Sequence, residues 1–133
     1  AEGIVPGGGT ALIRVQSAIE NLEIPDRDFN IGLDIIRRAI EAPLRTIVGN
    51  ASDKNGSEIV IAQVKKETGN VGYNARADRF EDLVEAGIID PTKVTRLALQ
   101  NAASIAGLLL TTECVVANKK EENKNNQQSF AGM

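Results

Sequence analysis

The sequence predicts a mainly α-helical protein with one short hairpin and one terminal β-strand. Over several stretches, apolar residues recur at spacings of three and four, which is typical of the buried face of a helix. Strong helix start and stop signals, above all Asp90-Pro91, lie at the ends of these stretches. The 133 residues are enough for one domain with its own core.

The first predicted helix follows a glycine-rich loop. Gly7-Gly8-Gly9 predicts a loop that runs into a helix, and Thr10 is a candidate N-cap. Leu12, Val15 and Ile19 then supply one apolar face. This pattern indicates a single helix after the loop.

The next helix is expected to begin at Asp26 or Asp28, either of which can act as the N-cap. Its predicted buried stripe consists of Ile31, Ile35, Ala39 and Ile40. Its predicted solvent face carries the charged residues Asp34, Arg37, Arg38 and Glu41. Pro43 cannot continue this helix but suits the first turn of another.

Two further helices are predicted before the middle of the chain. The apolar face of the helix that Pro43 begins consists of Leu44, Ile47, Val48 and Ala51. Residues 53–56 predict a turn, after which Ser57 can cap a segment that ends near Glu67. The run 59–62 fits a strand or a helix by pattern alone, and we assign it to a helix.

A short hairpin or tight loop is predicted at 68–74, and Leu83 and Val84 are assigned to a short helix that Gly87 ends. Asp90 as a cap and Pro91 at the first helical position then predict a helix to about residue 111. The side chains expected inside are Val94, Leu97, Ala98, Ala102, Ile105, Leu108 and Leu109.

Residues 114–117 predict a short terminal strand in which Cys114 is a small buried hydrophobe. A single strand needs a partner, and no second strand of similar quality is evident, so its partner is expected elsewhere. Residues 118–133 are polar and nearly without apolar anchors, which predicts a disordered tail.

Composition excludes several function classes. The absence of histidine rules out histidine acid–base catalysis, Ser–His pairs and imidazole metal sites. A single cysteine excludes an intrachain disulfide, and a net charge of −3 disfavours a nucleic-acid binder such as a helix-turn-helix protein. The longest strongly apolar run, 105–110, is far shorter than the roughly 20 residues of a membrane span, so we expect a soluble protein.

Three features could carry chemistry, and each has a simpler structural interpretation. Gly7-Gly8-Gly9 before a helix could approach an anion or nucleotide, but it also fits an ordinary turn, and neither common nucleotide motif is present. Asp90 could accept hydrogen bonds from sugar hydroxyls or only cap its helix. Asn74 could contact a ligand or only fix a turn.

Four stretches together resemble the C-terminal half of the equatorial domain of GroEL-like group I chaperonins. They are EGIVPGGGTAL (2–12), AIEAPLRTIV (39–48), GYNA (72–75) and a longer segment at 86–113 that contains GIIDPTKVTR. The resemblance covers roughly residues 1–117 and implies the helical bundle of that equatorial domain. It also implies a part in an ATP-dependent ring that assists protein folding.

The resemblance implies a role for individual residues of an ATP site. The backbone at Gly7 and Gly8 would line the pocket, and Asp90 would accept hydrogen bonds from the ribose hydroxyls. Ile88 would pack on the apolar side of the adenine. The hairpin residues implied to lie against the adenosine are Asn74, Ala75 and Arg76, of which Arg76 stands where the family commonly has a small residue.

The resemblance also implies what this stretch lacks. The family's phosphate-binding loop, its catalytic aspartate and its apical domain have no counterpart in the sequence, so no catalytic residue or metal ligand is expected here. ATP or ADP, with magnesium and potassium, would be held in the complete site, and this chain alone is expected to have no ATPase activity.

The partners implied are the remainder of the subunit, identical neighbours in a ring, and client proteins and a co-chaperonin through the apical domain. No nucleic acid or membrane partner is expected. The bacterial cytoplasm is the expected location, with an organelle matrix as the alternative. A non-catalytic helical assembly module remains the other interpretation of the chain.

Overall fold

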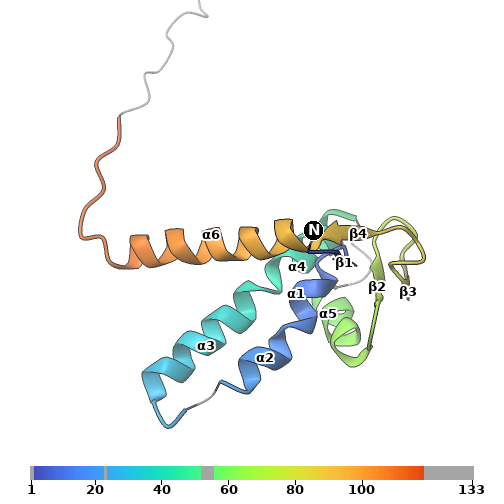
Figure 1. Ribbon diagram of the computed structural model, residues 1–133, viewed down its shortest axis with the longest axis horizontal. Helices are drawn as coiled ribbons and strands as arrows, with labels where there is room; N and C mark the ends of the chain where they lie inside the picture. The colour runs from blue at the N-terminus through green and yellow to red at the C-terminus, as the bar shows by residue number, and fades with distance from the viewer. Residues whose placement is uncertain (1, 23, 52–55, 119–133) are drawn as a thin grey trace, which may run out of the picture. The chain divides into compact units, whose positions relative to one another are not determined.

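The computed structural model describes residues 2–22, 24–51 and 56–118, and the chain divides into two units, residues 1–99 and 100–133. The first unit contains the elements β1 (Ile4–Pro6), α1 (Thr10–Arg14), α2 (Gln16–Glu20), α3 (Arg27–Ala39), α4 (Ala42–Ala51), α5 (Ser57–Lys66), β2 (Val71–Asn74), β3 (Arg79–Asp82) and β4 (Ile89–Pro91) (Figure 1). The last helix, α6 (Thr92–Leu110), begins in the first unit and ends in the second. The predicted mainly helical fold is confirmed. Most of the predicted turn at 53–56 and nearly all of the predicted tail lie outside the described residues.

Two antiparallel strand pairs complete the first unit. A hairpin is present, but β2 and β3 form it over residues 71–82 rather than at 68–74, and Tyr73 lies opposite Phe80 in it. The sequence did not predict the second pair, β1–β4, in which Val5 lies opposite Asp90. Each of these strands has three residues and ends in proline, which is too short for an alternating pattern to be seen.

The predicted terminal strand is not formed. Residues 114–117 belong to no helix or strand, and Cys114 is exposed rather than buried. A strand is stable only when its backbone groups pair with a neighbour, and the part of the chain that the structure describes supplies none for this segment. The polar tail after it is described only at Asn118.

The predicted helix ends are partly correct. The side chain of Asp26 caps α3 by accepting a hydrogen bond from the backbone N–H of Phe29 at 2.9 Å, as predicted. Thr10 does not act as a cap, because α1 already begins at this residue and Gly9 precedes it with a φ of 80°. The helix predicted after the glycine loop is also divided at Val15 into α1 and α2.

The short helix predicted at Leu83 and Val84 is a turn instead. The carboxylate of Asp82 accepts hydrogen bonds from the backbone N–H groups of Val84 and Glu85, at 2.9 and 3.0 Å. This local pairing replaces helical bonds, as is typical of an aspartate at the start of a turn. Gly87, with a φ of 74°, lies at the end of the turn just before β4.

The core of the first unit lies where α1, α4, α5 and β2 meet. Its buried members are Ile13, Leu44, Val48, Val60, Ile61, Val64 and Tyr73, and Ala75 packs against them. Of the predicted face of α4, Leu44 and Val48 reach the core, while Ala51 is exposed. The run 59–62, which was assigned to a helix, lies in α5, and this helix contributes three of the core residues. The loop between β1 and α1 lies close to this cluster, because a Cβ added to Gly9 would lie 2.8 Å from the backbone nitrogen of Leu44. The hairpin contributes Tyr73 to it.

Two predicted apolar faces are exposed in the part of the chain that the structure describes. In α3, Ile35 is 62% exposed and Ile31 is exposed as well, while Ile40 just after the helix is buried. In α6, Leu108 is 63% exposed, and Val94 and Ile105 are also exposed. Helical periodicity identifies an apolar face but not the element that covers it. Among the described helices, none has the length and apolar character needed to cross a membrane.

Candidate functional site

The pairing of β1 with β4 brings Gly7 close to Ile88 and Asp90, which lie far from it in the sequence. Val5 is opposite Asp90, and two residues later the backbone N–H of Gly7 donates to the carbonyl oxygen of Ile88 at 2.9 Å. A Cβ on Gly7 would lie 3.1 Å from that oxygen, so the two backbones are in close contact. The amide of Gly7 is thereby used within the protein, which leaves it unavailable to an anion.

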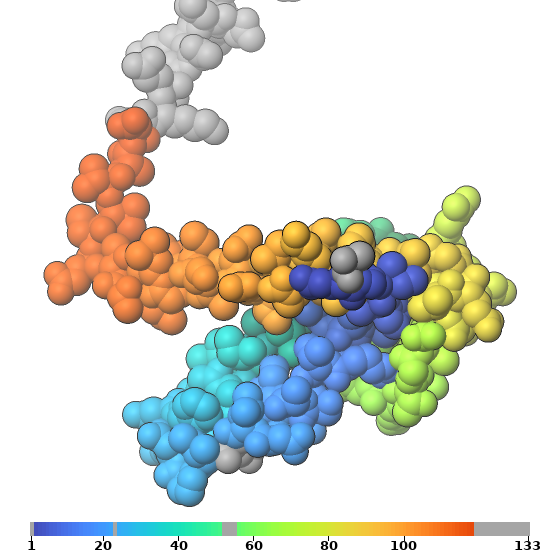
Figure 2. Space-filling view, in the orientation of Figure 1, coloured from blue at the N-terminus to red at the C-terminus, as the bar shows by residue number. Residues whose placement is uncertain are grey.

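An ion pair closes the opposite end of the strand pair, beyond Ile4 and Pro91. Arg96 donates from Nε to Oε2 of Glu2 at 3.0 Å and from Nη2 to Oε1 at 2.7 Å. The hydrogen bonds from Arg96 lower the pKa of Glu2 and raise that of Arg96. In Figure 2, β1 (dark blue) lies against the surface formed by β4 and the first turns of α6. The segment that carries Asp90 is thus held at both ends.

The glycine loop also lies close to the hairpin. Gly8 adopts a φ of 62°, and a Cβ built on it would lie 3.6 Å from the carbonyl oxygen of Tyr73. Thr10 is fully buried, and its Oγ1 has no hydrogen-bond partner within the described residues. A Cβ on Gly72 would lie 2.3 Å from that oxygen. The loop and β2 therefore pack directly on each other.

Asn74 fixes the turn between β2 and β3. Its Oδ1 accepts hydrogen bonds from the backbone N–H groups of Arg76 and Ala77, at 3.0 and 3.1 Å, and its amide nitrogen donates to Glu81. The hydrogen bonds from Asn74 and from Arg79 lower the pKa of Glu81. The conformational interpretation of Asn74 thus holds, and the side chain has little capacity left for a ligand.

Asn74→Ala is expected to cost about 1–2 kcal/mol of stability, because two backbone N–H groups lose their acceptor. Urea unfolding of the two proteins measures the difference. Asn70→Ala is the matched control, since Asn70 is exposed and lies just before the same hairpin. Equal losses in the two variants would contradict the role of Asn74 in the turn.

Asp90 does not cap α6, because β4 continues through Pro91 and the helix begins at Thr92. The side chain is half-buried and makes no hydrogen bond or ion pair with any residue that the structure describes. Its carboxylate can therefore accept hydrogen bonds from outside the chain. Of the two interpretations of Asp90, the structure removes the capping one.

A hollow of about 530 Å³ adjoins the turn that Asn74 fixes. It is lined by Ile47, Asn50, Ala51, Ala75 and Arg76. Ala75 and Arg76 were predicted from the sequence to be site residues, whereas Ile47, Asn50 and Ala51 of α4 were not. Asn50 and Ala51 follow Ile47 by three and four residues, which places both on its face of α4, and this spacing is the signal that could have identified them together.

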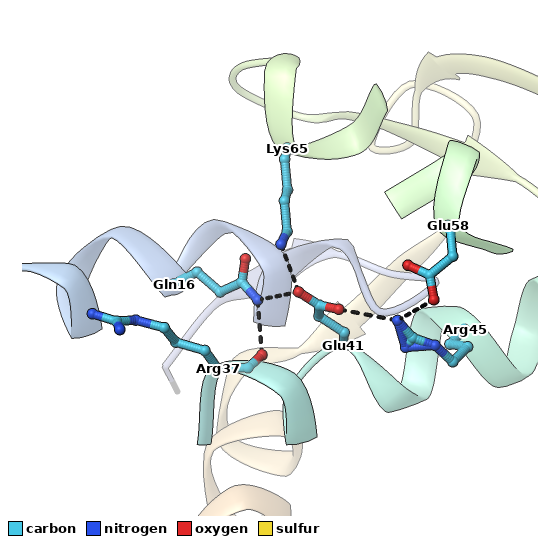
Figure 3. Close-up of polar contacts among 6 residues, drawn as sticks. All are labelled: Gln16, Arg37, Glu41, Arg45, Glu58 and Lys65. Carbon is cyan, nitrogen blue, oxygen red and sulfur yellow. Dashed lines mark hydrogen bonds and ion pairs between the residues drawn. The ribbon is translucent and has the colours of Figure 1, made fainter. Parts of the chain in front are cut away.

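A second polar cluster surrounds Glu41, which the sequence placed on a solvent face. Glu41 is 9% exposed and accepts hydrogen bonds from Lys65 at 2.5 Å and Gln16 at 2.9 Å (Figure 3). Arg45 lies 3.2 Å from its other oxygen and 2.9 Å from Glu58. Burial alone would raise the pKa of Glu41, but the hydrogen bonds and charges of its partners outweigh this and lower it. The cluster joins α2, α4 and α5.

Among residues 2–22, 24–51 and 56–118, there is no group of three or more Asp, Glu, His or Cys side chains that could hold a metal ion.

Comparison with known proteins identifies the class. The sequence matches the TCP-1/cpn60 chaperonin family over residues 1–120, and the chain belongs to this family. Its structure is similar to that described as the open state monomer of a group II chaperonin from Methanococcoides burtonii, with a TM-score of 0.69 and 18% sequence identity. The match covers 82% of this chain and 28% of that chain. The likeness confirms a chaperonin fold, and the chain spans 28% of the length of the protein it matches.

Proposed function

We propose that residues 1–117 are the C-terminal segment of the equatorial domain of a chaperonin subunit, with residues 118–133 as a polar tail. The observation that carries this proposal is the β1–β4 pairing, which joins the glycine loop to Ile88 and Asp90. The glycine loop lies far from Ile88 and Asp90 in the sequence, and two short strands bring them together on one surface.

The surface formed by the glycine loop, Ile88 and Asp90 is proposed to contact the adenosine part of ATP or ADP. Asp90 accepts hydrogen bonds from the ribose hydroxyls, which is supported by its half-buried carboxylate without a partner in the described structure. Ile88 packs on the apolar side of the base, and Gly8 allows close approach beside Tyr73. Asn74 acts mainly by fixing the turn that presents Ala75 and Arg76.

The phosphate, magnesium and potassium contacts are proposed to come from parts of the subunit outside this sequence. In that case residues 1–133 alone do not hydrolyse ATP. The subunit would assemble with identical neighbours into a ring and assist the folding of client proteins with a co-chaperonin. The exposed apolar faces of α3 and α6 support contact with further protein.

The subunit is proposed to be of the group I type, in the bacterial cytoplasm. This rests on the stretches at 2–12, 39–48, 72–75 and 86–113, which resemble GroEL-like chaperonins. The structural neighbour is a group II chaperonin at 18% identity, a likeness of fold that does not distinguish between the groups.

Asp90→Ala is expected to weaken ATP binding by the assembled chaperonin about tenfold or more, because a hydrogen bond to a charged acceptor contributes about 1.5–3 kcal/mol. Titration calorimetry at fixed salt measures the dissociation constant. The fold should be little affected, since Asp90 makes no side-chain hydrogen bond in the described structure.

Glu85→Ala is the control, because it removes an exposed carboxylate from the turn just before β4. An unchanged ATP affinity in the Asp90 variant would contradict the ribose assignment. A chaperonin that assembles but loses no affinity would instead favour a non-catalytic assembly role for this segment, which the exposed faces of α3 and α6 also suit.

A further inference from the structure

Arg14, the last residue of α1, binds three backbone carbonyls that lie 50 or more residues further along the chain. Its guanidinium donates to the carbonyl oxygen of Val64 in the last turn of α5, of Gly69 at 3.4 Å, and of Val71 at the start of β2 at 2.7 Å. The last four carbonyls of a helix have no partner within it, and a positive charge is favourable there. Arg14 thus joins α1 to the end of α5 and to β2.

These contacts depend on the guanidinium group of Arg14. The side chain is half-buried, and burial lowers its pKa, while the charge of Glu67 opposes this shift. A guanidinium stays protonated in proteins and holds five N–H donors in a fixed fork, so it can bind several separate acceptors at once. A lysine has a single nitrogen at the end of its side chain, which cannot span the same three carbonyls.

The bond to Val71 is the last of three contacts that run along β2. The glycine loop and α1 meet successive residues of the strand in opposite chain order: Gly8 lies beside Tyr73, Thr10 beside Gly72 and Arg14 at Val71. The first two are packing contacts, whereas the third is a directional hydrogen bond. The bond of Arg14 therefore fixes where β2 lies along α1.

The position of β2 against α1 is also its position against the surface proposed to contact adenosine. The glycine loop is continuous with α1 and is bonded to Ile88 through the backbone N–H of Gly7. Gly8 of the same loop lies beside the carbonyl oxygen of Tyr73 in β2. A shift of β2 along α1 would therefore change how the loop and the hairpin lie next to each other.

We propose that Arg14 is a positioning residue for the nucleotide, because it holds β2 on α1 and so fixes the hairpin beside the glycine loop. The inference rests on the proposed function, since it takes the glycine loop, Ile88 and Asp90 to contact the adenosine. It goes beyond that function by assigning part of the affinity to a side chain that does not touch the ligand. Arg14 acts through the backbone of β2, to which its donors are bonded.

The test measures ATP and ADP binding by the assembled chaperonin that contains this chain. Arg14→Met keeps an apolar stem of similar length and removes every donor. It should weaken both nucleotides by about fivefold or more, and by the same factor, because both carry the adenosine. In ATP hydrolysis by the same assembly, KM should rise and kcat should stay unchanged, since contacts to the adenosine are the same in the ground and transition states. Arg14→Lys should recover part of the affinity.

Glu41→Ala is the control for a general loss of stability. Glu41 also links α5 to the rest of the first unit, but its partners, Gln16, Arg45 and Lys65, lie outside the glycine loop and β2. Urea unfolding compares the stability that Glu41→Ala and Arg14→Met lose. The affinity for ATP should be unchanged in Glu41→Ala. An affinity that falls in both variants in proportion to their loss of stability would overturn the positioning role.

The remaining outcomes separate this inference from the proposed function. If Asp90→Ala weakens ATP binding and Arg14→Met does not, the inference fails and the proposed function stands. If the unmodified chaperonin binds neither nucleotide, both fail. If Arg14→Met does not assemble, Arg14→Lys decides, because an ATP affinity equal to that of the unmodified protein would overturn the inference.

Discussion

Gly9→Ala is expected to destabilise the protein by about 3 kcal/mol, the sum of a backbone cost and a packing cost. Gly9 has a φ of 80°, and an L-residue in this left-handed region costs about 1–2 kcal/mol. An added Cβ would also lie 2.8 Å from the backbone nitrogen and 3.0 Å from the Cα of Leu44. Leu44 is fully buried at the start of α4, so relief requires a shift of the core, which typically costs about 1–3 kcal/mol.

Gly3→Ala separates the two costs, because Gly3 has the same φ of 80° and no atom within 4 Å of the Cβ that would be added. Its expected loss is the backbone cost alone, about 1–2 kcal/mol. Urea unfolding followed by circular dichroism measures both variants. Equal losses of stability at Gly3 and Gly9 would show that the contact with Leu44 does not contribute to the loss at Gly9.

This difference assigns separate roles to the three glycines of the loop. Gly7 allows close approach to Ile88, Gly8 supplies a positive φ beside Tyr73, and Gly9 does both against Leu44. The turn interpretation of the triple glycine is therefore sufficient for its conformation. Since α1 has only five residues and the N–H of Gly7 is bonded to Ile88, an anion site made by the helix terminus is not supported.

Local signals predicted the elements that depend on local physics. The cap at Asp26, the assignment of 59–62 to a helix and the burial of Leu44 and Val48 are correct, because helix ends and helical periodicity depend on residues within one or two turns. The faces of α3 and α6 are apolar as predicted but exposed, because burial depends on what lies opposite. The predicted strand at 114–117 is absent for the same reason, since strand pairing is not a local property.

The candidate site was predictable only in part from the residues alone. Asp90 and the glycine loop stood out by type and spacing, but their proximity depends on β1 and β4, which are too short to show a pattern. The contribution of α4 to the hollow was hidden because Ile47 and Ala51 were interpreted as ordinary core residues. Glu41 was misplaced because a charged residue at the end of a helix usually faces water.

Glu41→Ala is expected to cost about 2–3 kcal/mol, since it leaves nearby donors without their common acceptor. Gln16 is buried and donates to both Glu41 and the backbone carbonyl of Arg37, at 2.9 Å each, so it would lose one of its two partners in a site with little water. Glu41→Gln keeps a carbonyl oxygen for these donors and should cost less. Urea unfolding at pH 7 measures each loss.

The pH dependence tests the same cluster independently. The folded-state pKa of Glu41 lies below its ordinary value of 4.5, so its ionised form is favoured by folding. The contribution of Glu41 to the free energy of unfolding is therefore fully present above its ordinary pKa. It is lost as the pH falls from there through the lower folded-state pKa. The stability difference between the unmodified protein and Glu41→Gln should shrink over that interval and stay constant above it.

Glu58→Gln is the control and should show a stability difference near zero throughout, because its carboxylate is 78% exposed and its pairing with Arg45 is screened by water. A Glu41 difference that is unchanged between pH 7 and pH 3 would mean that the carboxylate contributes through its shape and not through its charge.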